Sequence, residues 1–278
     1  MRLALLIIEA KLAKTEVAMK LEAPILESFK SLSGKTALIT GASAGFGRAT
    51  AILLASAGVK VLAVARRLEK LKELQALNPL IHPLVVDVSH DLAPISDVIK
   101  LQPVDILINN AGLARGRENF SETKPEVWNE LFDINVKGLI AVTSLVLPGM
   151  LERNRGDIVN LGSIAGLHTY AGGSIYCATK FAVHALSEAW RQDVLGKDIR
   201  VIEICPGMAE TEFSIVRFKG DLQKAKATYE GMIPLTAEDV AQEIFWALSR
   251  PRHITLQNVV IMPTDQAAVG LVHRRKST

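Results

Sequence analysis

From residue 35 onward, short apolar runs rich in β-branched side chains alternate with longer stretches whose apolar positions recur at helical spacing. The short runs predict buried strands at Thr36–Thr40, Val59–Ala65, Leu84–Val88, Asp105–Asn109, Asp157–Leu161, Val201–Ile204 and Val259–Met262. The longer stretches predict helices, among them Phe46–Ala57, Pro125–Leu151, Ser174–Leu195 and Ala237–Leu248. Such alternation is typical of a parallel sheet with helices on both faces. We therefore predict an α/β fold: a single doubly wound Rossmann-type domain with a seven-stranded, mostly parallel sheet.

Two segments depart from this alternation. Residues 1–33 precede the first strand, and apolar positions such as Ile8 and Leu12 suggest an amphipathic helix, although Met19 is an alternative start. We therefore predict an N-terminal extension over 1–33 and a main domain over 34–278. Residues 208–235 form a long, charged stretch without a strand pattern. A long insertion after the carboxyl end of a strand predicts a lid over an active site.

Composition narrows the class of protein. Of the 278 residues, 49% are hydrophobic and 22% are charged, which fits a globular chain. The net charge is only +3 and the basic residues are scattered, so we expect no nucleic-acid partner. Cys177 and Cys205 are too few for a disulfide framework, which favours reduced thiols and a cytoplasmic location.

Neither a membrane span, an export signal nor a metal site is expected. No segment approaches the roughly 18 continuous apolar residues of a span. The apolar start, Leu3 to Ile8, is followed by Glu9 and has no small-residue cleavage site, so it does not predict export. The histidines do not cluster with other ligand residues.

A glycine-rich loop follows the first predicted strand. It lies where a strand turns into a helix, so its backbone can approach a pyrophosphate at the helix N-terminus. A purely structural turn is the alternative interpretation. We predict that the loop binds a dinucleotide through Gly41, Ala42, Ser43, Ala44, Gly45, Phe46 and Gly47.

The end of the second predicted strand indicates which dinucleotide. An NAD-selective fold usually has an acidic side chain there, whereas this chain has Arg66 and Arg67. Two guanidiniums can hold a 2′-phosphate, although they could also simply begin a solvated helix. The sequence therefore predicts NADP as the cofactor. Asp87, Val88 and Asn110 follow later strands at the same edge of the sheet, and we predict that they also bind the cofactor.

Acid–base chemistry is indicated by Tyr176, the only one of the three tyrosines with a lysine four residues later, Lys180. Side chains at this spacing share a helix face. An ammonium beside a phenol is expected to lower the phenol pKa, as a general acid/base for alcohol–carbonyl interconversion requires. Ser163, at the end of the fifth predicted strand, can donate a hydrogen bond to the same substrate oxygen. Each residue could also be an ordinary surface or loop residue.

Taken together, the segments Thr40–Gly47, Asn109–Gly112, Asn135, Ser163, Tyr176–Lys180 and Pro206–Gly207 resemble, in this order, the motifs of the short-chain dehydrogenase/reductase family. The resemblance covers the chain from about residue 34 to its end. It implies that Asn135 anchors a proton-relay water and that Tyr176 and Lys180 also contact the cofactor. It further implies that Pro206, Gly207 and Thr211 line the nicotinamide.

The chain is also similar to a narrower branch, the NADP-dependent 3-hydroxy acid dehydrogenases. This branch includes L-allo-threonine and serine dehydrogenases and malonic semialdehyde reductases. The segments that carry this similarity are 44–47, 170–173, 211–214, 216–221, 235–240 and 270–274. It implies a homotetramer that oxidises a small 3-hydroxy acid at its 3-hydroxyl.

A substrate carboxylate requires a cation. Arg217 in the predicted lid, or Arg115 and Arg117 after the fourth strand, are the candidates, and each could instead be a solvated charge. Two alternatives stay open. One is reduction of another carbonyl substrate, such as a ketone, a sugar or a 3-oxoacyl thioester. The other is a nucleotide sensor without turnover.

Overall fold

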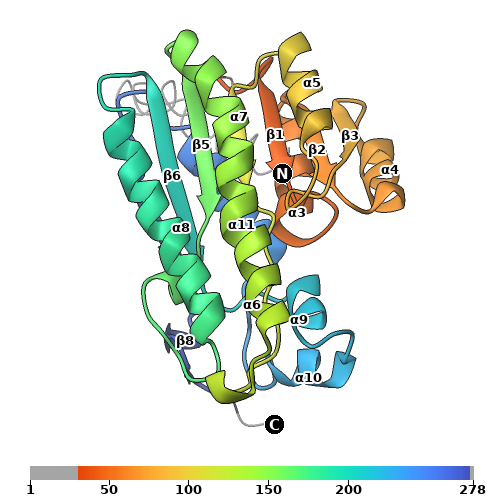
Figure 1. The fold of residues 1–278 in the computed structure, drawn as a ribbon, viewed down its shortest axis with the longest axis vertical. Coiled ribbons are helices and arrows are strands. Elements are labelled where there is room, and N and C mark those ends of the chain that lie inside the picture. Colours follow the sequence, from red (N-terminus) through yellow and green to blue (C-terminus); the bar gives the residue numbers. More distant parts are fainter. Residues whose placement is uncertain (1–30, 276–278) are drawn as a thin grey trace, which may run out of the picture.

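The fold is built on a parallel sheet of seven strands (Figure 1). The computed structural model describes residues 31–275. The strand order is β3-β2-β1-β4-β5-β6-β7, and every pairing is parallel. The bounds are β1 Thr36–Thr40, β2 Lys60–Ala65, β3 Ile81–Val85, β4 Ile106–Asn109, β5 Gly156–Leu161, β6 Ile199–Pro206 and β7 Asn258–Ile261. This confirms the predicted doubly wound α/β class.

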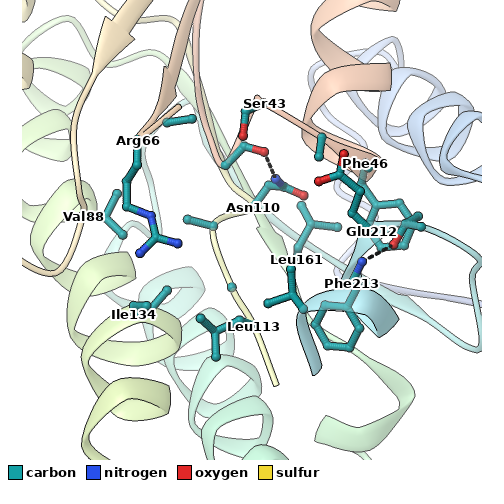
Figure 2. Close-up of a pocket in the computed structure, with 18 of the residues that line it drawn as sticks. Ser43, Phe46, Arg66, Val88, Asn110, Leu113, Ile134, Leu161, Glu212 and Phe213 are labelled. Atoms are coloured by element: carbon teal, nitrogen blue, oxygen red, sulfur yellow. Dashed lines mark hydrogen bonds between the residues drawn. The ribbon is translucent and has the colours of Figure 1, made fainter. Parts of the chain in front are cut away.

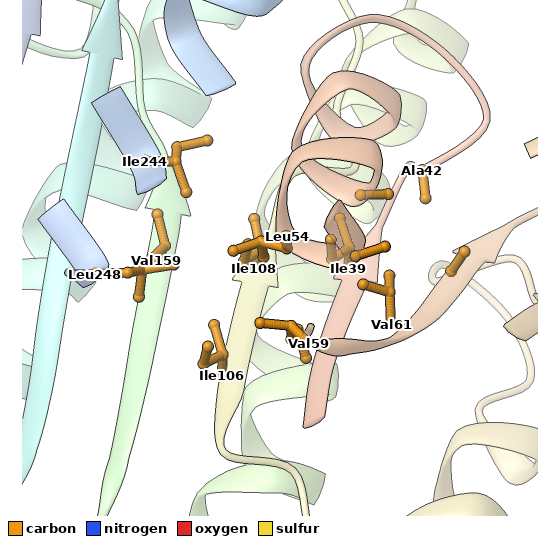
Figure 3. Close-up of a cluster of buried hydrophobic side chains, with 14 of the residues drawn as sticks. Ile39, Ala42, Leu54, Val59, Val61, Ile106, Ile108, Val159, Ile244 and Leu248 are labelled. Atoms are coloured by element: carbon orange, nitrogen blue, oxygen red, sulfur yellow. The ribbon is translucent and has the colours of Figure 1, made fainter. Parts of the chain in front are cut away.

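Helices cover both faces of the sheet, as right-handed crossovers between parallel strands require. They are α3 Gly45–Ser56, α4 Leu68–Leu77, α5 Ala93–Leu101, α6 Pro125–Phe132, α7 Leu139–Glu152, α8 Ser174–Asp193 and α11 Ala237–Leu248. One hydrophobic cluster joins the sheet to α3, α4 and α11, and Figure 3 shows Leu54, Ile244 and Leu248 packed against strand residues. A second cluster joins the opposite face to α5, α6, α7 and α8.

The edge strand β3 lies three residues earlier than predicted. It spans Ile81–Val85 rather than Leu84–Val88, and it contains Pro83 opposite Ala63 of β2. A proline cannot donate to a sheet ladder, so within sheets it is confined to edge strands, strand ends and bulges. Pro83 is tolerated in β3 because β3 is an edge strand and has a neighbour on one side only.

The predicted helix Pro125–Leu151 is interrupted. Asp133–Gly138 winds as a π-helix between α6 and α7, and Asn135 lies within it. Such insertions are frequent at functional sites. By length and composition alone, Pro125–Glu152 could cross a membrane. Here Leu131 and Val142 of this stretch are buried in the second cluster, as in the core helix of a globular domain.

The predicted lid contains two short helices, α9 Glu212–Arg217 and α10 Leu222–Ala227, and no strand. It lies below the sheet in Figure 1, at the lower right. The last two described strands form a small hairpin of β8 Gln266–Ala268 and β9 Leu271–Val272, and Figure 1 labels β8 at the lower left. Short 3-10 turns occur at η1 Phe120–Glu122 and η3 Ile164–Gly166. Most of the predicted extension 1–33 lies outside the described residues, but Leu32 is fully buried in the first cluster.

Candidate active site

Two adjoining cavities lie at the carboxyl ends of the strands, where ligands of open α/β sheets bind. The first, of about 390 Å³, is bordered by the turn after β1, the ends of β2 and β4, and the lid (Figure 2). The second, of about 310 Å³, lies between η3, the end of β6, the lid and the C-terminal hairpin. Tyr176 lines both cavities, so one side chain faces both of them.

The glycine-rich turn after β1 forms one wall of the first cavity. Gly41 has a φ of +66°, and a Cβ atom there would lie 2.8 Å from Nδ2 of Asn110, so only glycine fits. The Asn110 amide in turn donates to the Thr40 carbonyl at 2.8 Å, which ties β4 to β1. The predicted residues that line the cavity are Gly41, Ser43, Ala44, Gly45, Phe46 and Asn110.

Two residues predicted in this turn do not line the cavity. Ala42 is fully buried in the first hydrophobic cluster. Gly47 faces the turn itself, and a Cβ atom there would lie 2.6 Å from the Gly41 carbonyl oxygen. Their role is therefore packing: Ala42 fills the core, and Gly47 lets helix α3 approach the turn closely.

Both arginines at the end of β2 border the first cavity. Arg67 donates to the Ser43 hydroxyl from Nε and Nη2, at 3.2 and 3.0 Å, and its Nη1 lies 2.8 Å from a carboxylate oxygen of Glu212 in the lid. Arg66 lies 3.5 Å from Asp87. The arginine side chain of each pair is solvent-exposed, so each ion pair contributes little to the free energy of folding. A phosphate group bound to either arginine can therefore displace the carboxylate.

The remaining predicted cofactor residues lie at the same edge. Asp87 and Val88 line the first cavity. Hydrogen bonds from Ser89 and the charge of Arg66 outweigh the opposing effect of burial and lower the pKa of Asp87, which favours its ionised form. Pro206 and Gly207 line the second cavity, and Thr211 lines both.

Ser163, Tyr176 and Lys180 converge where the cavities meet. Ser163 caps η3 after β5, with its Oγ accepting from the Ala165 amide at 3.1 Å. Its side chain also forms a hydrogen bond with Tyr176. Lys180 Nζ donates to the Leu161 carbonyl at 2.6 Å, which anchors α8 to the end of β5. The sequence spacing thus brings the three side chains together, as predicted.

The prediction that Lys180 lowers the pKa of Tyr176 is wrong. Burial raises the pKa of Tyr176 to about 12, although the charge of Arg217 and the hydrogen bond from Ser163 act in the opposite direction. Burial also lowers the pKa of Lys180 to about 8. Desolvation disfavours the charged form of each group, so it outweighs their helical proximity.

Asn135 connects three elements beneath the site. Its Oδ1 accepts from the Leu113 amide at 2.9 Å, and its Nδ2 donates to the Leu113 carbonyl at 2.9 Å and to the Thr179 hydroxyl at 3.1 Å. Thr179 itself donates to the Tyr176 carbonyl at 2.8 Å. The side chain therefore helps to fix the helix turn that carries Tyr176, while its water-anchoring role stays a prediction.

Arg217 is the cation closest to the reacting groups. It is only 8% exposed, its Nη2 donates to the Tyr170 hydroxyl at 2.8 Å, and its guanidinium lies 5.2 Å from the centre of the Tyr176 ring. Its Nε is buried and has no hydrogen-bond acceptor. A buried donor without a partner is costly, so this atom indicates a place for an anionic ligand in the second cavity.

The other predicted substrate cation, Arg115, does not line either cavity. Its guanidinium holds both carboxylate oxygens of Glu130, at 2.8 and 2.5 Å, and donates to the Val216 carbonyl at 2.7 Å. A bidentate pair of this kind satisfies the donors and neutralises the charge. Arg115 therefore braces α6 against the lid, and its predicted substrate role is not supported.

Several lining residues were not predicted as site residues. Tyr170, Phe213 and Arg274 occur within the segments that resemble the 3-hydroxy acid dehydrogenases, and this similarity could have identified them, whereas Tyr229 lies outside those segments. Within residues 31–275, no group of three or more His, Cys, Asp or Glu side chains could hold a metal ion. The cavities thus offer groups for anion binding and proton transfer.

Comparison with known proteins gives a consistent family assignment. A family model described as short chain dehydrogenase matches residues 35–221. The chain is 42% identical over 257 residues to an NADP-dependent 3-hydroxy acid dehydrogenase of Schizosaccharomyces pombe, covering 88% of this chain and 99% of the relative. It is 43% identical over 246 residues to the enzyme of that name from Escherichia coli, covering 86% and 99%.

Two solved structures are also similar to this chain. A closed form of serine dehydrogenase complexed with NADP+ superposes with a TM-score of 0.81 at 42% identity, over 87% of this chain and all of that one. The serine dehydrogenase of Escherichia coli gives a TM-score of 0.72 at 37% identity, over 84% and 99%.

Proposed function

The chain belongs to the short chain dehydrogenase family, and on that premise we propose that it interconverts a small 3-hydroxy acid and its 3-oxo form with NADP(H). One observation carries the substrate class: the buried Arg217, with an unpartnered Nε, borders the cavity that Ser163 and Tyr176 also line. A carboxylate placed there would satisfy this donor while the carbon bearing the hydroxyl faces Tyr176.

The first cavity has the groups that NADP requires. The glycine turn lets a pyrophosphate approach α3, and Arg66 and Arg67 can hold a 2′-phosphate once the exposed pair with Glu212 yields. Lys180 lines the same cavity together with Tyr176, and a nicotinamide ribose bound there would be within its reach. NADP, when bound, supplies or accepts the hydride.

The protein contributes the proton chemistry. In the oxidative direction the phenolic oxygen of Tyr176 accepts the proton of the substrate hydroxyl, and in the reductive direction it returns it. Ser163 donates a hydrogen bond to the substrate oxygen. The positive charge of Arg217 favours the phenolate, against the burial that raises the pKa of Tyr176. Asn135 keeps α8 in register with the end of β4.

The test uses a matched pair of substrates. With NADP+, we expect turnover of 3-hydroxypropionate, L-serine or L-allo-threonine, followed by NADPH absorbance. We expect kcat/KM for 3-hydroxypropanamide, which lacks only the negative charge, to be at least about tenfold lower than for 3-hydroxypropionate. Reduction of ketones, sugars or 3-oxoacyl thioesters without turnover of any 3-hydroxy acid would favour the alternative substrate class and reject this proposal.

We further propose a homotetramer located in the cytoplasm. The support for the tetramer is the similarity of the C-terminal segment 270–274 to the 3-hydroxy acid dehydrogenase branch. The support for the location is that Cys177 and Cys205 are both buried and unbonded, as in reducing compartments. Light scattering on the purified chain tests the assembly, because a monodisperse mass other than four chains contradicts it.

A further inference from the structure

The second cavity has more positive charge than a single carboxylate can neutralise. Three arginines line it: Arg217, Arg117 and Arg274. None of the described residues that line it is an aspartate or a glutamate. A cavity lined by charges of one sign concentrates the field and attracts ligands of the opposite sign. The excess charge therefore favours a ligand with more than one anionic group.

Arg117 is placed next to the cavity by an aromatic contact alone. Its guanidinium lies 5.9 Å from the centre of the Tyr170 ring, and no carboxylate pairs with it among the described residues. Arg117 and Arg274 are both solvent-exposed. Desolvation of the Arg117 guanidinium and the charges of Arg217 and Arg274 nevertheless lower the pKa of Arg117, so these like charges repel one another at the cavity. An anion between them would remove that repulsion.

Arg274 is held in position without being neutralised. From the tail that follows β9, its Nη2 donates to the Thr228 carbonyl at 3.1 Å and its Nη1 to the Glu230 carbonyl. Carbonyl oxygens fix the plane of the guanidinium but carry no net charge. The C-terminal segment thus brings a positioned cation to the side of the cavity formed by α10 and the hairpin.

Tyr170 lies between Arg117 and Arg217. Its hydroxyl accepts from Arg217, whereas its ring face is against Arg117. A carboxylate that satisfies Nε of Arg217 close to Tyr176 therefore meets a different part of the cavity from an anion near Arg117 and Arg274. A three-carbon acid, with a single carboxylate, leaves the second part without a partner.

On the basis of the proposed function, we propose that Arg117 and Arg274 form a subsite for a second carboxylate, so that the preferred substrates are 3-hydroxy dicarboxylates. One carboxylate pairs with Arg217, the hydroxyl-bearing carbon faces Ser163 and Tyr176, and the other carboxylate lies between Arg117 and Arg274. The cavity of about 310 Å³ is at the lower end of those that enclose drug-sized ligands, so a five-carbon diacid fits its size class.

The experiment compares 3-hydroxyglutarate with its monoamide, which has nearly the same shape and one charge less, using NADP+ and wild-type protein. We expect kcat/KM to be at least about tenfold higher for the diacid. Arg117→Gln and Arg274→Gln should each reduce this ratio several-fold and, combined, bring it to about one. Arg155→Gln, an exposed arginine at the opposite end of the sheet, is the matched control and should leave the ratio unchanged.

A parallel assay with 3-hydroxypropionate separates this subsite from the proposed function. Turnover of 3-hydroxypropionate, together with a diacid-to-monoamide ratio of one or less in the wild type, overturns the second-carboxylate subsite alone. A high ratio that survives both arginine substitutions overturns it as well. Absence of turnover with every 3-hydroxy acid rejects the proposed function, and the subsite with it. Unchanged melting temperatures verify that the variants are folded.

Discussion

The guanidinium carbon of Arg217 lies 5.2 Å from the centre of the Tyr176 ring. A residue of the lid thus places a permanent positive charge beside the residue proposed as general acid/base. Because this charge lowers the pKa of Tyr176 against the effect of burial, the position of the lid and the acidity of the phenol are linked. Any movement of α9 away from the site would make Tyr176 a weaker acid.

Replacing Arg217 should therefore change both pH dependence and affinity. In Arg217→Gln, loss of the cation raises the pKa of Tyr176, so the rising limb of the pH profile for alcohol oxidation moves to higher pH. We also expect kcat/KM for 3-hydroxypropionate to fall about 100-fold. Arg217→Lys is the control, because it keeps the charge near the ring. A profile in Arg217→Gln that does not move would contradict the electrostatic link.

Removing the phenolic hydroxyl should abolish proton exchange without affecting the fold. For Tyr176→Phe we expect kcat to fall by about 10²–10⁴-fold in both directions. NADP affinity, measured by calorimetry, should change little, because the aromatic ring that lines the first cavity is retained. Full reductase activity in Tyr176→Phe would exclude this residue as the acid/base, whatever the substrate.

The Arg67–Glu212 pair predicts opposite effects of two charge-removing substitutions. Arg67→Gln should weaken NADP binding about tenfold and leave NAD binding nearly unchanged, since only NADP has the 2′-phosphate. Glu212→Gln should strengthen NADP binding, because it removes a carboxylate 2.8 Å from Arg67 that competes with the phosphate. Isothermal titration with both cofactors measures the two effects. Equal losses for NAD and NADP in Arg67→Gln would argue against phosphate recognition.

A buried ion network should dominate the response of stability to charge removal. Asp157 pairs with Arg200 at 2.7 Å and with Arg252 at 2.6 Å, and both Asp157 and Arg200 are almost fully buried. Asp157→Asn leaves Arg200 without its counter-ion, so we expect a loss of about 3–5 kcal/mol in the free energy of unfolding. The control Asp97→Asn breaks an exposed pair and should cost less than about 1 kcal/mol. Denaturant titrations of the two variants provide the comparison.

Burial of Lys180 predicts a stability that increases with pH. Its pKa is about 8 in the folded protein and about 10.4 when unfolded, so between these values the unfolded chain binds more protons. The contribution of Lys180 to the free energy of unfolding should therefore rise by about 2 kcal/mol from about pH 7 to about pH 9.5. The difference between wild type and Lys180→Met, measured at both pH values, isolates this term. A difference that is independent of pH would mean that Lys180 is not desolvated.

Local patterns predicted the framework of the molecule. The sheet and the meeting of Ser163, Tyr176 and Lys180 follow from strand–helix alternation, because parallel strands end at one edge and residues four apart share a helix face. The edge strand was placed three residues too late, and only the sheet order reveals that β3 has one neighbour and can contain Pro83.

Properties that depend on contacts between residues distant in the sequence could not be predicted from local patterns. Arg115 and Arg217 were equivalent as sequence candidates, and only folding shows that Glu130 neutralises the former while the latter keeps a free donor. The pKa of Tyr176 was predicted from its lysine neighbour, whereas the burial that dominates it comes from the whole site. Arg274 belongs to a segment that resembles the 3-hydroxy acid dehydrogenases, but only the folded chain shows that this C-terminal residue lines the second cavity.

Pro83 has a consequence for how copies of this chain can associate. Unpaired edge strands are templates for edge-to-edge pairing and fibrillar aggregation, and a proline without an N–H interrupts that template. The β3 edge is therefore protected against continuous pairing, whereas β7, at the opposite edge, contains no proline. Of the two edges, β7 is therefore the one whose backbone N–H groups are not interrupted by a proline and could continue the sheet into a second subunit.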